Sequence, residues 1–120
     1  MIHKQIIGKK GEQLAVDYLI SNNYKICHKN WRKGKDEIDI IALEDDFIIF
    51  VEVKTRTSDF FGQPESFVNQ RKQENMIRAA NAYVEEKDID KEVRFDIISI
   101  ILSNNKTSLK HIKDAFNALS

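Results

Sequence analysis

The feature that most constrains the fold of this chain is the stretch Asp36–Lys54, which reads DEIDIIALEDDFIIFVEVK. It contains two runs rich in Ile, Val and Phe, Glu37–Leu43 and Phe47–Lys54, separated by Glu44 and the pair Asp45-Asp46. Such runs are typical of buried β-strands, and adjacent aspartates tolerate a tight turn. The stretch therefore predicts a β-hairpin whose second strand is central in a sheet that is covered on both faces.

Four charged side chains interrupt these apolar strands, namely Glu37, Asp39, Glu52 and Lys54. Side chains alternate along a strand, so a two-residue turn places Asp39 opposite Glu52 and Glu37 opposite Lys54. Opposed residues have Cβ atoms about 5 Å apart. A slip of one residue would move Asp39 and Glu52 to opposite faces. The interpretation therefore requires an even turn or a bulge that restores the register.

Two buried carboxylates at this separation repel each other unless a cation lies between them. Oxygen ligands suit hard cations, so Asp39 and Glu52 predict a site for Mg²⁺ or Mn²⁺. A metal beside a lysine suits phosphodiester hydrolysis, because the metal polarises the phosphoryl group and activates a water molecule. Lys54 would then stabilise charge on the phosphate or orient the attacking water. As a general base it is less convincing beside two carboxylates.

The composition fits a single domain over residues 1–120 and limits the classes of partner. Lys+Arg and Asp+Glu both number 19, so the formal net charge is zero. This counts against a protein-wide positive field but leaves room for a local basic patch. The single cysteine, Cys27, suits a reducing compartment. The N-terminus does not resemble a signal peptide and no apolar run reaches membrane-spanning length, so we expect a cytoplasmic protein without a membrane partner.

The N-terminal part predicts a helix over Ile6–Asn22 and a strand over Tyr24–Asn30. Glu12 lies at the edge of the apolar stripe of this helix, where a surface glutamate would also lie. Basic residues then surround Trp31, and they are Lys29, Arg32, Lys33 and Lys35. The cluster either contacts phosphates or forms a solvated turn around Gly34, and both alternatives stay open. For Trp31 itself, packing on the core is favoured.

The rest of the chain predicts four further segments, a loop over Thr55–Gln63, a helix over Glu65–Glu86, a strand over Val93–Leu102 and a closing helix over Leu109–Leu119. Pro64 suits the first turn of the second helix.

Two pairs of polar residues in these segments are candidates for contacts. Lys72 continues the apolar face of the second helix, with Gln73 beside it, and either reaches water or reaches a polar site at the end of the sheet. Arg94 and Asp96 share one face of the following strand and can form a structural pair.

Several stretches, taken in order, resemble the YraN-like family of small bacterial proteins, namely GKKGEQLAVDYL, NWRKGKDEIDIIA, IIFVEVKTR, FGQP, RFDIISI and HIKDAF. The spacing Asp39…Glu52-Val53-Lys54 is also similar to the PD-(D/E)xK nuclease signature, with Ile38 in place of the proline. The resemblance covers nearly the whole chain. It implies an α/β (α+β) restriction-endonuclease-like fold, a mixed central β-sheet flanked by helices, closest to archaeal Holliday junction resolvases.

The resemblance further implies a metal site formed by Glu12, Asp39 and Glu52, with Lys54 beside it. The expected activity is that of a Mg- or Mn-dependent DNA endonuclease, with branched or single-stranded DNA as candidate substrates and a homodimer expected by analogy with resolvases. The candidate substrate contacts are Lys29, Arg32, Lys33, Lys35, Arg56, Lys72 and Gln73. The alternative is a nucleic-acid-binding or partner-binding module that keeps this fold without catalysis, so enzymatic activity is one of two open hypotheses.

Overall fold

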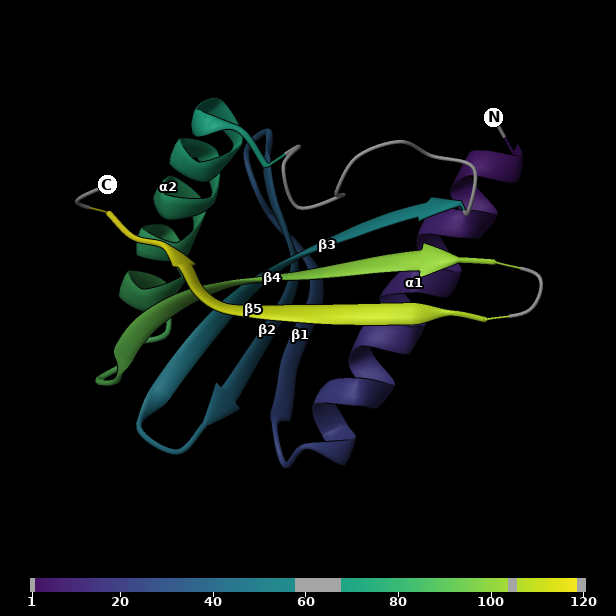
Figure 1. Cartoon of the computed structure of the whole chain (residues 1–120). Helices are drawn as coiled ribbons and strands as arrows, with labels where there is room; N and C mark the ends of the chain where they lie inside the picture. The colour runs from purple at the N-terminus through teal and green to yellow at the C-terminus, as the bar shows by residue number, and fades with distance from the viewer. Residues whose placement is uncertain (1, 58–67, 104–105, 119–120) are drawn as a thin grey trace.

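The fold is one mixed five-stranded β-sheet with a helix on each face, as the computed structural model shows for residues 2–57, 68–103 and 106–118 (Figure 1). The strands lie side by side in the order β1-β2-β3-β4-β5. Neighbours are antiparallel except β3 and β4, which are parallel. The elements are α1 (Ile2–Ser21), β1 (Lys25–Lys33), β2 (Asp36–Glu44), β3 (Phe47–Thr57), α2 (Gln70–Glu86), β4 (Glu92–Leu102) and β5 (Ser108–Phe116). The expected α+β architecture is confirmed.

Each helix covers its own part of the sheet. α1 packs mainly on β3, with β1 and β4, and α2 packs on the opposite face over β2 and β1. Along β3, Val51 belongs to the core cluster under α1, whereas Phe50 belongs to the cluster under α2. Because both residues are fully buried, β3 is the doubly covered central strand that its continuous apolar sequence predicts.

The close approach of α1 to β3 depends on a glycine. Gly11 is buried in α1, and a Cβ atom at this position would overlap the side chain of Thr55 on β3. A residue without a side chain therefore allows the helix to lie directly on the strand. Glu12 follows immediately, so this contact also fixes the height at which its carboxylate meets the sheet.

The predicted hairpin register is correct where the two strands pair. Glu44 pairs with Phe47, and the connection consists of Asp45 and Asp46. Asp45 has φ of 52°, a left-handed conformation that Asp tolerates better than most residues. β3 is longer than expected, because residues Thr55–Thr57 continue the ladder with β4 instead of forming a loop.

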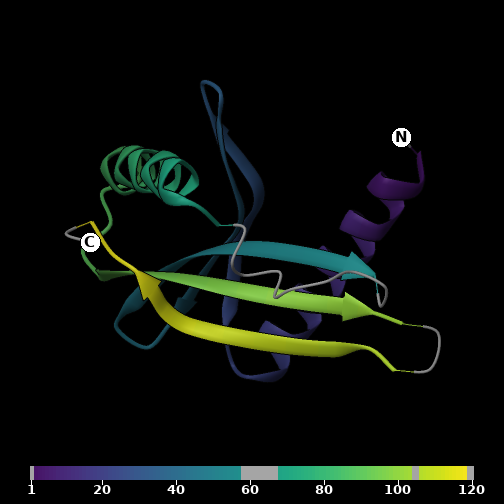
Figure 2. The same ribbon diagram turned by 45° about the horizontal axis from the view of Figure 1, so that its top comes forward.

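The basic cluster lies mostly on a strand and only partly on a turn. β1 extends to Lys33, and only Gly34, with φ of 62°, and Lys35 form the turn into β2. The resulting β1–β2 hairpin extends beyond the rest of the sheet (Figure 2). Trp31 packs on the core as expected, edge to face with Tyr83 at a centroid distance of 5.2 Å.

One expected element is wrong, and another begins later than expected. The segment expected to form a closing helix is strand β5, paired with β4. Its apolar residues repeat at helical spacing, but Leu109 packs on the α1 side of the sheet whereas Ile112 and Phe116 pack on the α2 side. A helix would have placed all three on one side, so pairing with an open sheet edge overrides the pattern.

The second correction concerns the start of α2. The helix begins at Gln70, and Val68 and Asn69 precede it in non-helical conformation. The Asn69 side chain accepts a hydrogen bond from the backbone N–H of Lys72 at 2.9 Å, which makes Asn69 the N-cap. Pro64 and the other residues of 58–67 lie outside the described part of the chain.

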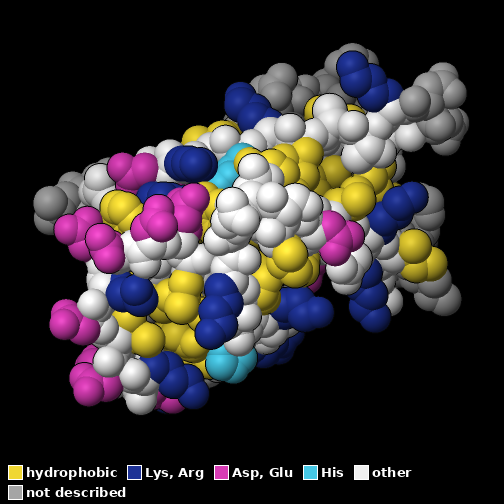
Figure 3. Space-filling view, turned by 90° about the horizontal axis from the view of Figure 1, so that it is seen from below, with side chains coloured by type: hydrophobic (Ala, Val, Ile, Leu, Met, Phe, Trp, Pro, Cys, Tyr) yellow, Lys and Arg dark blue, Asp and Glu magenta, His cyan; other side chains and the backbone are white. Residues whose placement is uncertain are grey.

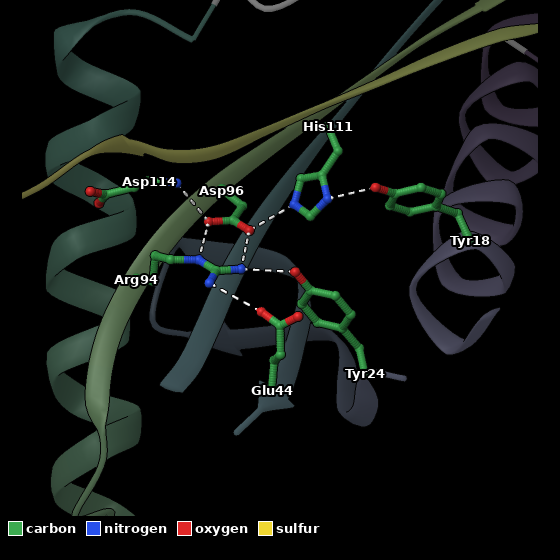
Figure 4. Close-up of polar contacts among 7 residues, drawn as sticks. All are labelled: Tyr18, Tyr24, Glu44, Arg94, Asp96, His111 and Asp114. Carbon is green, nitrogen blue, oxygen red and sulfur yellow. Dashed lines mark hydrogen bonds and ion pairs between the residues drawn. The ribbon is translucent and has the colours of Figure 1, made fainter. Parts of the chain in front are cut away.

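A cluster of polar side chains on the α1 side of the sheet connects β4 and β5 with α1 through hydrogen bonds (Figure 4). Arg94 donates two hydrogen bonds of 2.9 Å to Asp96, which confirms the expected pair. His111 on β5 bridges Asp96 at 2.7 Å and the hydroxyl of Tyr18 on α1 at 2.9 Å. Burial opposes ionisation of Asp96, but the hydrogen bonds from His111 and Arg94 hold its pKa below the ordinary value. This cluster is structural, because each carboxylate oxygen of Asp96 already has donors.

Candidate functional site

The candidate site lies where β2 and β3 separate. The paired residues of the hairpin end at Ile40 and Val51, so Asp39 and Glu52 are the next residue on each strand. Beyond this point the backbone N–H of Val53 donates to Asp39 Oδ2 at 2.8 Å. The Asp39 carboxylate thus takes the place of a strand carbonyl. The two strands therefore separate after Ile40 and Val51, at a point that we call the fork, without leaving the Val53 N–H unpaired.

A twist in β2 creates the fork. Ile38 and Ile40 are two residues apart and should share a face, yet Ile38 packs in the cluster under α2 and Ile40 in the cluster under α1. The neighbouring strand is irregular at the same level. Asn30 lies between the residues of β1 that pair with Ile38 and Ile40, and its φ is 53°. Both strands are therefore distorted around Asp39, as occurs where a strand re-aims a side chain.

Glu52 is a buried carboxylate with one oxygen that no described residue hydrogen-bonds. Its side chain is only 4% exposed, and Oε1 has no hydrogen-bond donor among the described residues. Two ammonium groups approach it without hydrogen bonding, Lys54 Nζ at 3.6 Å from Oε2 and Lys72 Nζ at 3.6 Å from Oε1. An orphaned buried carboxylate oxygen destabilises the fold unless a ligand completes it.

The electrostatics of the fork favour an additional positive charge. Burial, together with the negative charge of Asp39, raises the pKa of Glu52 to about 7. Burial also raises the pKa of Asp39, although the Val53 N–H and Lys72 act in the opposite direction. The two lysines therefore do not offset the burial of two facing carboxylates. A divalent cation between them would do so.

Glu12 adds a third carboxylate on the far side of Asp39. Burial and the charge of Asp39 raise the pKa of Glu12, while a hydrogen bond from the Asn30 side chain lowers it. Glu12 lines two adjoining hollows. One, of about 390 Å³, runs along the end of β3 past Lys54 and Arg56. The other, of about 250 Å³, lies between α1 and β1 and is lined by Lys9, Gln13, Lys29 and Asn30 among others.

The residues present fit a magnesium-type ion held by two carboxylates. Among the described residues, no three His, Cys, Asp or Glu side chains lie close enough together to hold one metal ion. The preformed unit is therefore the Asp39–Glu52 pair, with Glu12 beside Asp39 and not beside Glu52. Mg²⁺ is commonly bound by one or two carboxylates and keeps several waters, so the pair and the orphaned Glu52 Oε1 suit it.

The structure brings some of the predicted contact residues to the site. Lys54 and Lys72 meet at Glu52 from β3 and α2, respectively. Arg56 lines the larger hollow and Lys29 the smaller one. Four predicted residues thus lie around the carboxylates, two of them at the hollows that Glu12 also lines.

Other predicted contact residues are engaged elsewhere. Arg32 pairs with Glu37 at 3.2 Å, so the expected opposition of Glu37 and Lys54 is wrong, because β2 has already left β3 at this level. Lys33 pairs with Glu86 of α2 at 2.9 Å, and Lys35 is exposed in the turn. The Gln73 amide donates to the Val68 carbonyl at 3.1 Å and supports the start of α2.

Asn30 is the site residue that sequence reasoning missed. Its side chain lies close enough to Glu12 to lower the pKa of that carboxyl, and the residue lies beside Asp39 in the register between β1 and β2. Its left-handed backbone is the kind of conformation that collects at functional sites. Asparagine is one of the few residues that adopts it readily, so an Asn at the end of the expected strand is the signal that the sequence offers.

Comparison with known proteins identifies the family. The model of "Uncharacterised protein family UPF0102" matches residues 11–100, which include α1 from Gly11, the fork and most of β4. The chain belongs to the UPF0102 family. This confirms the expected relationship to YraN-like proteins.

Relatives in several bacteria cover almost the same length as this UPF0102 chain. A UPF0102 protein of Christiangramia forsetii is 48% identical over 92% of this chain and 92% of its own length. A UPF0102 protein of Bacteroides thetaiotaomicron is 47% identical over 92% of this chain and 91% of its own. One of Thermodesulfovibrio yellowstonii is 46% identical, with coverage of 92% and 95%. None of the helices in the described residues has the length and apolar character needed to cross a membrane.

Proposed function

We propose that this UPF0102 chain is a metal-dependent DNA endonuclease of the cytoplasm, in which Asp39 and Glu52 hold Mg²⁺ or Mn²⁺. The observation that carries this proposal is the state of Glu52. Its Oε1 is buried and receives no hydrogen bond from any residue that the structure describes, and its carboxylate faces that of Asp39 at the point where two strands separate. Such an arrangement costs stability in the free protein, so a site that retains it is best explained by a bound cation.

The residues around the pair suit phosphodiester hydrolysis. A divalent cation, when bound, supplies Lewis-acid activation of the phosphate and of water. Lys54 is fixed on the central strand with its ammonium beside Glu52, where it can stabilise negative charge that develops on a phosphate oxygen. Glu12 and Asn30 line the other side of the site. The two hollows that Glu12 lines leave room for a DNA strand to pass the carboxylates.

The distribution of surface charge supports a nucleic-acid substrate in spite of the zero net charge. Acidic side chains gather toward one end of the face shown in Figure 3. Exposed acidic residues occur in two adjacent segments, the β2–β3 turn and the connection from α2 to β4, where the Glu92 N–H donates to the Asp46 carbonyl at 3.1 Å. These segments lie at the start of β3, whereas Glu52 lies half-way along the strand. Phosphates can therefore approach the site without crossing the most acidic surface.

The alternative function is a nucleic-acid-binding or partner-binding module that keeps the site without catalysis. One observation favours it, since Glu12 does not join Asp39 and Glu52 in a preformed group of three ligands. Under this alternative the same basic residues would bind DNA, and metal would have no effect on the DNA backbone. The expected homodimer stays a prediction under both functions.

The test is a cleavage assay with Mg²⁺ or Mn²⁺ on duplex, single-stranded, flap and four-way-junction DNA. We expect cleavage of at least one substrate and its loss in Glu52→Gln, which keeps the size of the side chain and removes its charge. DNA binding by Glu52→Gln should persist, because phosphate contacts depend on other residues. In contrast, Lys29→Ala, at a basic residue that lines the smaller hollow beside Glu12, should weaken binding and lower its salt dependence. Equal cleavage by Glu52→Gln would show that the site is assigned wrongly, and DNA binding without cleavage would favour the alternative.

A further inference from the structure

Lys72 occupies the position where a cation is most strongly favoured. Its ammonium lies 3.6 Å from Glu52 Oε1, the buried oxygen for which the described part of the chain supplies no hydrogen-bond donor. It also interacts electrostatically with two other carboxylates, Asp39 and Asp36. Asp36 is already held by two hydrogen bonds from Arg78, at 2.8 and 2.9 Å. The charge of Lys72 is therefore available mainly to the Asp39–Glu52 pair.

The position of Lys72 in α2 is otherwise unfavourable. It lies in the first turn of the helix, where the unpaired backbone N–H groups make the local potential positive, and this turn contains no acidic residue. Arg71 precedes it in the same turn but is exposed to solvent. A lysine directed inward at this end of a helix is accounted for by the carboxylates that it faces.

The contact is also easy to break. At 3.6 Å the ammonium and the carboxylate are too far apart for a hydrogen bond, and the Lys72 side chain is 35% exposed. Lysine has a flexible four-carbon stem, so its ammonium can move into solvent while α2 remains in place. Lys54, in comparison, is 23% exposed and is carried by the central strand.

We propose that Lys72 is an exchangeable internal counter-ion, which occupies the cation position at Glu52 in the free protein and leaves it when a divalent metal binds. This inference rests on the proposed metal site. It adds a coupling between the binding of the metal and the binding of the phosphate. In the free protein, Lys54 and Lys72 match the carboxylates of Asp39 and Glu52 in number, although they do not offset the cost of burying them. A divalent cation makes the site positive, so it repels Lys72. The released ammonium then lies at the rim of the site, where the phosphate of an incoming strand can bind it.

Metal titration by calorimetry tests the competition directly. Lys72→Met keeps the apolar stem and removes the competing charge, so Mn²⁺ should bind on the order of tenfold more tightly than to the unmodified protein. Lys72→Arg restores a cation and should not tighten binding. Arg71→Met removes a charge from the same helical turn at an exposed position, and it should change the affinity by less than about twofold. Unchanged or weaker Mn²⁺ binding by Lys72→Met would overturn the proposal.

Amine labelling followed by peptide mass spectrometry tests the release. Mn²⁺ should increase the reactivity of the Lys72 amine toward an acylating reagent severalfold and leave that of Lys87, exposed at the other end of α2, unchanged. If Mn²⁺ binds and Lys72 is not released, the counter-ion role is wrong and the metal site stands. If no variant binds Mn²⁺, the metal-dependent function is wrong as well.

Discussion

Replacement of Glu52 by glutamine should stabilise the metal-free protein at pH 8. Burial and the neighbouring Asp39 raise the pKa of Glu52 from 4.5 to about 7. At 1.36 kcal/mol per pKa unit, this shift corresponds to about 3 kcal/mol of stability lost above pH 7. Glutamine removes the charge but is itself a buried polar group, so we expect a net gain of about 1–2 kcal/mol and a Tm increase of roughly 4–8 °C.

The pH dependence gives the sign of the effect. The pKa of Glu52 is higher in the folded than in the unfolded state, so the folded protein binds more protons between these two values. The free energy of unfolding should therefore decrease as the pH rises from about 4.5 to about 7, and this decrease should be smaller in Glu52→Gln. Urea unfolding at pH 5 and pH 8 measures both quantities.

Asp96→Asn is the matched control, since Asp96 is also a buried carboxylate in a strand. Its pKa is lowered by hydrogen bonds from His111 and Arg94 in spite of burial, so its charge stabilises the fold. Loss of that charge should destabilise the protein by about 3–5 kcal/mol. If Glu52→Gln is as destabilising as Asp96→Asn, Glu52 is a satisfied structural carboxylate and the reasoning fails.

Two further predictions concern metal and backbone. Saturating Mg²⁺ or Mn²⁺ should raise the Tm at pH 8 more than at pH 5, because Asp39 and Glu52 must be ionised to bind it, and an unchanged Tm at both values would speak against the site. Asn30→Gly keeps the left-handed backbone but removes the side chain that lies beside Glu12 and Asp39, so it should weaken Mn²⁺ binding severalfold in calorimetry. Asn23→Gly, at φ of 69° after α1, should not weaken it, and equal effects would remove Asn30 from the site.

The hairpin and its register could be predicted because they depend on local chemistry. A pair of aspartates between two apolar runs defines the turn, and strand alternation then brings Asp39 beside Glu52. The Arg94–Asp96 pair followed from the same alternation. Each of these features involves residues that are adjacent on one strand or across one turn.

The fork and its surroundings could not be predicted, because they depend on tertiary packing. Strict alternation does not contain the twist that places Ile38 and Ile40 in different core clusters. Alternation therefore predicts Lys54 as the partner of Glu37, whereas Glu37 pairs with Arg32. The approach of Lys72 to Glu52 depends on where α2 lies on the sheet. The pattern of the last strand predicts a helix, because apolar residues that pack on two faces of a sheet can repeat at helical spacing.

The central claim is that Asp39 and Glu52 together hold a divalent cation, and Mn²⁺ calorimetry at several pH values tests it most directly. Because the pKa of Glu52 is about 7, the metal must displace a proton from part of the population at neutral pH. Titrations in buffers of different ionisation enthalpy should therefore show proton release that increases as the pH falls from 8 to 6.5. Binding should be lost in Asp39→Asn and in Glu52→Gln. Absence of Mn²⁺ binding, or binding that these substitutions leave unchanged, would contradict the account.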